Sequence, residues 1–224
     1  KGLQELANQL FQQRLVAPEE LAVDYLEHVT NIDEALAGAR DILAEEMMET
    51  AEAREEARNL FTRKTTVKSS IAKGKQEAGI KYKDYFDWSE SLAQAPSHRI
   101  LALFRGENEG FLNLSLLGPD EEVLTKLERR FITGNNSCAK QVEMAIQDGY
   151  KRLLMPAMET EVRAEAKKRA DENAIRVFAE NIRQLLLAAP LGQKRVLALD
   201  PGFRTGCKVV CLDEQGSLLA NTAV

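Results

Sequence analysis

The chain has 224 residues, 44% hydrophobic and 29% charged, a composition typical of one large globular domain or two small ones. Its 30 basic and 35 acidic residues give a net charge of −5, which excludes a surface that is basic throughout but allows a local basic patch. Three Cys residues form no even disulfide framework, and no apolar run approaches the roughly 18 residues that span a bilayer. We therefore expect a cytoplasmic, helix-rich protein without a membrane segment. A start at Lys1 rather than Met, and an end at Val224 within a strand-like run, predict that both ends are cuts.

Residues 2–61 carry apolar side chains at helical spacing almost without a break. Pro18 suits the first turn of a helix that continues to His28, and Asn31 followed by Glu34 predicts an N-cap with its capping-box partner. Three later segments also predict helices, namely the one that begins at Pro119 with acidic residues in its first turn, residues 137–154 and residues 156–187. The last would be about 45 Å long, a length typical of helices that space or join domains.

Strands are expected in two places. Arg99–Phe104 and Phe111–Leu117 predict a β-hairpin with residues 106–110 as its loop. Residues 195–200, 207–212 and 217–224 predict three strands of a second domain. The predicted fold is thus mainly α. A multi-helical region (1–190) includes a basic segment with a hairpin (62–118) and the long connecting helix (156–187). The first strands of an incomplete α/β domain follow (191–224).

Charge is concentrated in two opposite blocks. Seven acidic residues lie between Asp41 and Glu56, which fits either a solvated helix face or a surface for a protein partner. Between Thr62 and Lys83 seven basic residues face one acid, Glu77, and aromatic residues follow at once. This pattern fits a nucleic-acid surface, with phosphates held by cations and bases stacked on rings, or a basic surface loop that aromatics anchor to the core. The candidate nucleic-acid-binding residues are Arg63, Lys64, Lys68, Lys73, Lys75, Lys81 and Lys83.

Asp200 ends an apolar strand and precedes a glycine-rich turn and a return strand. Glycines let phosphate or metal approach the backbone, so Gly202, Arg204, Thr205 and Gly206 are phosphate-turn candidates. Three interpretations stay open. Asp200 caps its own turn, or belongs to a ribonuclease H-like nuclease that holds divalent metals such as magnesium, or belongs to an actin-like phosphotransferase. One carboxylate cannot hold two metals, so we expect this fragment to be inert, with no cofactor of its own.

Five strings of residues resemble signatures of the Tex family of bacterial transcription accessory proteins. They are Gly38–Glu46 (GARDILAEE), Tyr82–Asp87 (YKDYFD), Pro96–Ala102 (PSHRILA), Asp148–Leu154 (DGYKRLL) and Leu199–Gly206 (LDPGFRTG). The resemblance implies a longer protein, similar to the core of Spt-type elongation factors. Its helical region and YqgF-type ribonuclease H-like domain would be followed by helix-hairpin-helix units and an OB-fold that binds RNA.

The same resemblance implies a non-enzymatic role. The fragment would be a helical scaffold in a protein that binds RNA or DNA, with RNA polymerase or ribosome-associated machinery as a further partner. Asp200 matches the first carboxylate of the YqgF-type pattern, but Phe203 stands where YqgF resolvase-like proteins usually carry a small hydroxylated residue. A metal-dependent nuclease or resolvase that uses Asp200, and a pure interaction module for the transcription machinery, are the alternatives.

Overall fold

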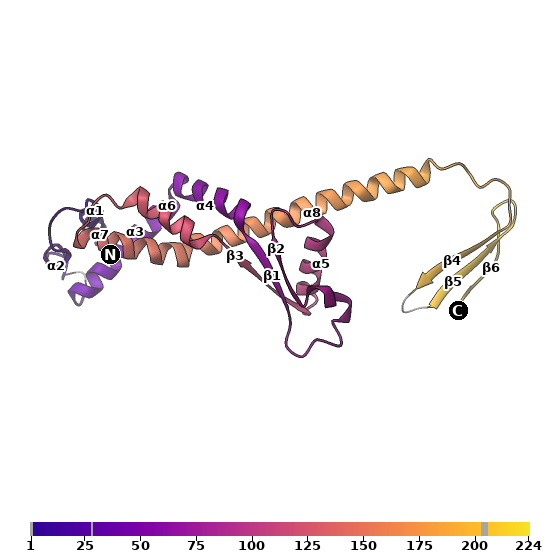
Figure 1. Ribbon diagram of the computed structural model, residues 1–224, viewed down its shortest axis with the longest axis horizontal. Coiled ribbons are helices and arrows are strands. Elements are labelled where there is room, and N and C mark those ends of the chain that lie inside the picture. The colour runs from indigo at the N-terminus through magenta and orange to yellow at the C-terminus, as the bar shows by residue number, and fades with distance from the viewer. Residues whose placement is uncertain (1, 28, 203–205) are drawn as a thin grey trace. The chain divides into compact units, whose positions relative to one another are not determined.

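The computed structural model describes residues 2–27, 29–202 and 206–224, which fall into two compact units, residues 1–175 and 176–224 (Figure 1). The elements of the chain as far as α8 are α1 (Gln4–Phe11), α2 (Pro18–Val23), α3 (Ile32–Glu49), α4 (Ala51–Lys64), β1 (Thr66–Ile71), the 3₁₀ helix η1 (Ile80–Tyr85), β2 (Asp87–Ser91), α5 (Ser97–Asn108), β3 (Leu112–Leu117), α6 (Asp120–Phe131), α7 (Ser137–Gly149), the π-helical turn η2 (Tyr150–Leu154) and α8 (Met155–Leu186). The mainly α-helical fold is confirmed.

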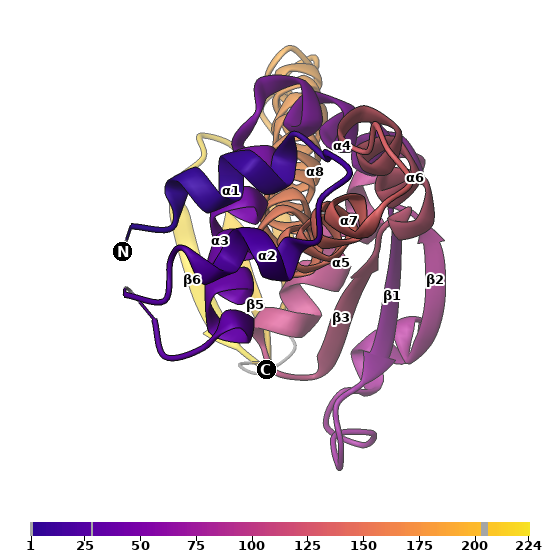
Figure 2. The ribbon, with the colours of Figure 1, turned by 90° about the vertical axis from the view of Figure 1, so that its left-hand side faces the viewer.

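In the first unit, α7 packs against α1, α2, α3 and α6. The start of α3 is as predicted, because the Asn31 side chain accepts a hydrogen bond from the Glu34 backbone N–H at 2.9 Å. Close packing of α3 on α7 depends on Gly149. A Cβ atom there would lie 2.9 Å from Met48 Cγ and 3.1 Å from Ala44 Cβ. Figure 2 shows α1, α2 and α3 on one side of this unit and β1–β3 on another.

The sheet of the first unit is antiparallel, in the order β2-β1-β3. The hairpin predicted from Arg99–Phe104 and Phe111–Leu117 is wrong, because residues 97–108 form helix α5 and β3 pairs with β1 instead. Three residues of α5 are buried at a spacing of three, Ile100, Leu103 and Gly106, which is the spacing of one helix face. The true partner of β3 lies about 40 residues earlier in the chain, so its pairing has no local signature.

The predicted long helix is confirmed, and the chain stays helical from Ser137 through α7, η2 and α8 to Leu186. The second unit contains the end of α8 and three strands, β4 (Val196–Gly202), β5 (Gly206–Leu212) and β6 (Leu218–Ala223), antiparallel in that order. In the turn before β6, the Asp213 carboxylate accepts hydrogen bonds from the backbone N–H groups of Gln215 and Ser217. These strands are the ones the sequence predicts. The boundary expected near Leu191 stays a prediction.

Candidate nucleic-acid interface

The seven basic residues predicted to contact nucleic acid lie on one continuous stretch of the first unit, and all seven are exposed. They follow one another as the last two residues of α4 (Arg63 and Lys64), the middle of β1 (Lys68), the β1–η1 loop (Lys73 and Lys75) and η1 (Lys81 and Lys83). The cations are therefore spread along the length of β1 and beyond it, with Arg63 and Lys64 before the strand and Lys73 and Lys75 after it.

Two of these cations are already paired. Both Glu122 carboxylate oxygens lie 2.7 Å from Lys64 Nζ, and Glu109 Oε2 lies 2.5 Å from Lys81 Nζ. The Glu109 carboxylate raises the pKa of Lys81, while Lys81 and Tyr82 together lower the pKa of Glu109. Within the described part of the chain no ion pair engages the other five, which are Arg63, Lys68, Lys73, Lys75 and Lys83. Those five cations are available to an external anion.

Lys68 lies on an open face of the sheet. Its neighbours across the sheet are Ser89 of β2 and Ser115 of β3, and all three side chains are exposed. The opposite face carries Val67 and Ser69, which are buried. The strand therefore holds the Lys68 ammonium group over small hydroxyl side chains, a setting that a phosphate can approach closely.

The β1–η1 loop has a defined backbone despite its exposure. Gly74 has a φ of +73°, a conformation that favours glycine, and the Ala72 N–H donates to the Phe111 carbonyl at 2.8 Å. The Gly79 N–H donates to the Lys75 carbonyl, also at 2.8 Å. The loop therefore presents Lys73 and Lys75 from a turn that its own backbone hydrogen bonds stabilise.

The aromatic residues after this loop anchor it. Tyr82 is buried, and its hydroxyl donates to Glu109 Oε2 at 3.0 Å. The rings of Tyr85 and Trp88 meet edge to face with centroids 5.9 Å apart, and both residues pack against the core together with Phe86. The rings of Tyr82, Tyr85, Phe86 and Trp88 therefore anchor the segment to the core, which argues against base stacking on them. The exposed cations beside them are still open to phosphate groups.

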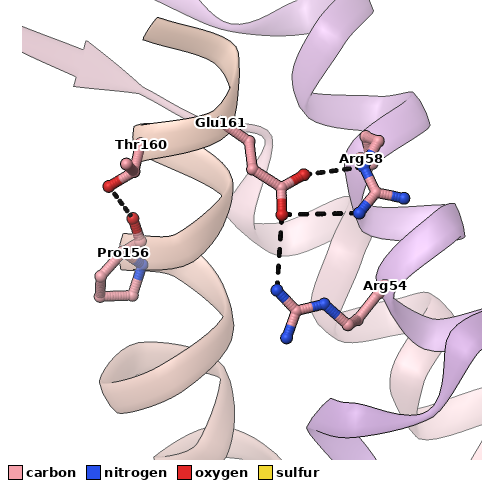
Figure 3. Close-up of polar contacts among 5 residues, drawn as sticks. All are labelled: Arg54, Arg58, Pro156, Thr160 and Glu161. Carbon is pink, nitrogen blue, oxygen red and sulfur yellow. Dashed lines mark hydrogen bonds and ion pairs between the residues drawn. The ribbon is translucent and has the colours of Figure 1, made fainter. Parts of the chain in front are cut away.

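An ion pair fixes α4, whose end begins the basic segment, to α8. Figure 3 shows the Glu161 carboxylate between two arginines, with Oε1 3.4 Å from Arg54 Nη2 and Oε2 2.7 Å from Arg58 Nε. Hydrogen bonding and charge from Arg58, and then from Arg54, lower the pKa of Glu161. Glu161 is about one-third exposed, so solvent weakens the interaction.

We expect Glu161→Gln to destabilise the chain by less than about 1 kcal/mol at pH 7, measured by urea unfolding. Because folding lowers the pKa of Glu161, its contribution is present above about pH 4.5 and is lost as the pH falls through the folded-state pKa. The two proteins should therefore converge in stability once the pH lies below the folded-state pKa of Glu161. Glu165→Gln, at an exposed position of the same helix, is the matched control. A difference that grows as the pH falls would contradict this assignment.

The acidic block fits a solvated helix face. Its residues lie on the outer faces of α3 and α4, while apolar residues between them, such as Leu43 and Met47, are buried. Several acids have partners within the first unit, since Asp41 pairs with Arg152 and Glu56 pairs with Arg130.

Asp200 lies near the end of β4, opposite Lys208 of β5, and is exposed. Gly202 pairs across the ribbon with Gly206, whose φ is +76°. The other two phosphate-turn candidates, Arg204 and Thr205, lie outside the described residues, as does Phe203. Among the residues that the structure describes, no three His, Cys, Asp or Glu side chains gather into a group that could hold a metal ion.

Comparison with known proteins agrees with this architecture. The model described as Tex central region-like matches residues 13–178, and the model described as Tex protein YqgF-like domain matches residues 194–224. The chain belongs to the Tex family. Its fold, with a helical region followed by the first strands of a second domain, is the one that this membership predicts.

Curated relatives of this Tex-family chain extend well beyond it. It is 35% identical to "Uncharacterized protein YdcI" of Bacillus subtilis over 98% of its own length and 31% of the relative. It is 36% identical to "Transcriptional accessory protein Tex" of Neisseria gonorrhoeae, over 100% of its own length and 30% of that relative. It is 27% identical to human "S1 RNA-binding domain-containing protein 1", over 84% of its own length and 20% of that relative. The chain thus spans about 30% of the bacterial relatives named here. None of its described helices is both long and apolar enough to cross a membrane.

Three further cations lie near the basic segment without belonging to it. Arg105 of α5, together with Arg163 and Lys167 of α8, lines a cleft that Lys81 also reaches. The sequence does not reveal this group, because Arg105 lies about 60 residues before Arg163 and Lys167, and only the packing of α5 beside α8 brings them together.

Proposed function

We propose that this chain is the helical scaffold of a cytoplasmic transcription accessory protein and contacts nucleic acid directly through its basic segment, residues 63–83. The observation that carries the proposal is the set of five exposed cations on that segment that no acidic side chain of the described residues engages. Phosphate groups of RNA or DNA are the anions that such a surface neutralises.

The relatives support the same role. One is named a transcriptional accessory protein and another an S1 RNA-binding domain-containing protein, which associates this family with transcription and with RNA. In the proposal the long helix holds the nucleic-acid-binding parts of the protein in register, and RNA polymerase or ribosome-associated machinery is the protein partner. The parts of the relatives beyond this chain supply further nucleic-acid contacts.

The salt dependence of binding tests the proposal. In the full-length protein, Lys68→Ala should reduce the slope of log affinity against log salt concentration by about 0.7 for a single strand or 0.9 for a duplex, because one phosphate contact is lost. Lys126→Ala, which removes an exposed lysine of α6, is the control and should leave the slope unchanged. Equal slopes for wild type and Lys68→Ala would count against a contact at this position.

The proposal gives Asp200 no catalytic role. The metal-dependent nuclease remains the alternative, and it makes a separate prediction. If the full-length protein cleaves a branched or RNA-containing substrate in the presence of Mg²⁺, and Asp200→Asn abolishes that cleavage, the enzyme would replace the scaffold as the function.

A further inference from the structure

A cleft of about 1320 Å³ lies between α5 and α8, entirely within the first unit. In Figure 1, α5 lies beside α8 at this place. Small-ligand sites usually enclose about 300–1,000 Å³, so this cleft is large enough for a segment of polymer. Its lining comes from η1, from α5 and the residue after it, and from α8.

Contacts at two places hold the walls of the cleft together. At one, the Asn173 amide donates to the Ser97 hydroxyl at 3.1 Å. At the other, Arg163 forms an ion pair with Glu107, and its guanidinium carbon lies 4.8 Å from the centre of the Phe104 ring. The cleft is therefore formed in advance of any ligand, and a ligand does not have to bear the cost of assembling it.

The charges of the cleft favour an anion. Four cations line it, at positions 81, 105, 163 and 167, against two carboxylates, at positions 107 and 109. Both carboxylates are already neutralised, because Glu107 pairs with Arg163, and Glu109 pairs with Lys81 and lies 4.0 Å from Arg105. The side chains of Arg105 and Lys167 are 75% and 50% exposed. Lys167 also forms an ion pair with Asp171 one turn further along α8, at 2.5 Å, so a phosphate that binds Lys167 has to compete with that carboxylate. Arg105 has only the 4.0 Å contact with Glu109 among the ion pairs of the described residues.

The walls between these cations are apolar. Leu101, Ala102 and Phe104 come from α5, and Ala164 comes from α8. Part of the Phe104 face is covered by the Arg163 guanidinium, a flat cationic group on which nucleobases stack. Cations beside apolar walls are the arrangement that binds a single strand, with phosphates on the charges and unpaired bases on the walls. The bases of a duplex are stacked on one another and could not use these walls.

We propose that this cleft binds a single-stranded segment of nucleic acid, with phosphates at Arg105 and Lys167 and bases against Phe104 and Ala164. The proposal rests on the proposed function, because it takes the polyanion to be nucleic acid. Lys81 belongs to both surfaces, so the strand would pass from the cleft to the basic segment. The inference adds to the proposed function a second nucleic-acid-binding surface, besides the basic segment, and a preference of that surface for single strands.

The test uses the full-length protein with a labelled 12-nucleotide oligo(U) and a duplex of the same length. Arg105→Glu combined with Lys167→Glu should weaken oligo(U) binding on the order of 10- to 30-fold in 0.1 M salt, because two phosphate contacts are lost, and should change duplex binding less than twofold. Lys126→Glu combined with Lys140→Glu is the charge-matched control, at exposed positions outside the cleft.

A second variant separates the walls from the charges. Ala164→Trp fills the cleft without changing its charge, so oligo(U) binding should weaken while the salt slope stays that of the wild type. If both cleft variants bind oligo(U) like the wild type while Lys68→Ala lowers the salt slope, the cleft inference is overturned and the proposed function stands. If none of these variants changes binding, both fail. Loss of RNA polymerase association with intact oligo(U) binding would also overturn the inference, in favour of a protein ligand.

Discussion

Replacing Lys68, Lys73 and Lys75 together by glutamate should lower the affinity of the full-length protein for single-stranded nucleic acid on the order of 100-fold in 0.1 M salt. Each phosphate contact contributes about 0.7 to the salt slope, which at this concentration corresponds to about fivefold in affinity. The losses in affinity from the three contacts multiply, and the introduced carboxylates also repel the phosphate groups of the strand. The measurement is a fluorescence-anisotropy titration of a labelled strand over a range of salt concentrations.

A control variant with three Lys→Glu substitutions elsewhere separates the effect of local phosphate contacts from the effect of the protein's net charge. Lys126, Lys140 and Lys151 are exposed and lie on α6, α7 and η2, away from the basic segment in the sequence. Changing these three to glutamate alters the net charge of the protein by the same amount. Equal losses of affinity in the two triple variants would show that binding responds to overall charge, which would contradict a specific role for residues 63–83.

Tyr150→Ala should destabilise the chain by about 3–5 kcal/mol, measured by urea unfolding, because it removes a large buried side chain at the π-helical turn. Tyr150 is 1% exposed, and its hydroxyl donates a 2.5 Å hydrogen bond to Asp120 Oδ1 at the start of α6. Burial, and then the Asp120 carboxylate, raise the pKa of Tyr150. The phenol therefore stays neutral and keeps donating throughout the neutral range.

Tyr150→Phe isolates the hydrogen bond from the ring. Tyr150→Phe should lower the free energy of unfolding by about 1–3 kcal/mol, because the Asp120 carboxylate loses a partly buried hydrogen-bond donor while the aromatic ring still fills its place. Tyr85→Phe is the control, since no hydrogen bond of the Tyr85 hydroxyl is present among the described residues, and it should change stability by less than about 0.5 kcal/mol. If Tyr150→Phe is no more destabilising than Tyr85→Phe, the contact with Asp120 does not stabilise the turn.

Much of the fold follows from local patterns. The cap at Asn31, the long helix α8 and the strands β4–β6 are each determined by a few neighbouring residues, and each is present. Residues 99–104 predict a strand although they belong to helix α5, because Ile100, Leu101, Leu103 and Phe104 form a short apolar run, which suits either structure. Only the burial of Ile100 and Leu103 on one side, against the rest of the unit, decides in favour of the helix.

The candidate interface was predictable only in part. A count of charges locates the basic segment, but it cannot show that Glu122 and Glu109, far along the chain, engage Lys64 and Lys81. Nor can it place Arg105 beside Arg163, since about 60 residues separate them and only tertiary packing brings them to one cleft. Sequence position identifies the cations, and the fold decides which of them a ligand can use.

Photocrosslinking tests the central claim, direct contact between nucleic acid and the basic segment, most directly. The full-length protein would be irradiated with 4-thiouridine-containing RNA, digested and examined by mass spectrometry. The account predicts crosslinked peptides from residues 66–86, which contain β1, the lysine-bearing loop and η1. They should disappear in the Lys68, Lys73 and Lys75 triple variant. Crosslinks confined to parts of the protein beyond these 224 residues would contradict the account.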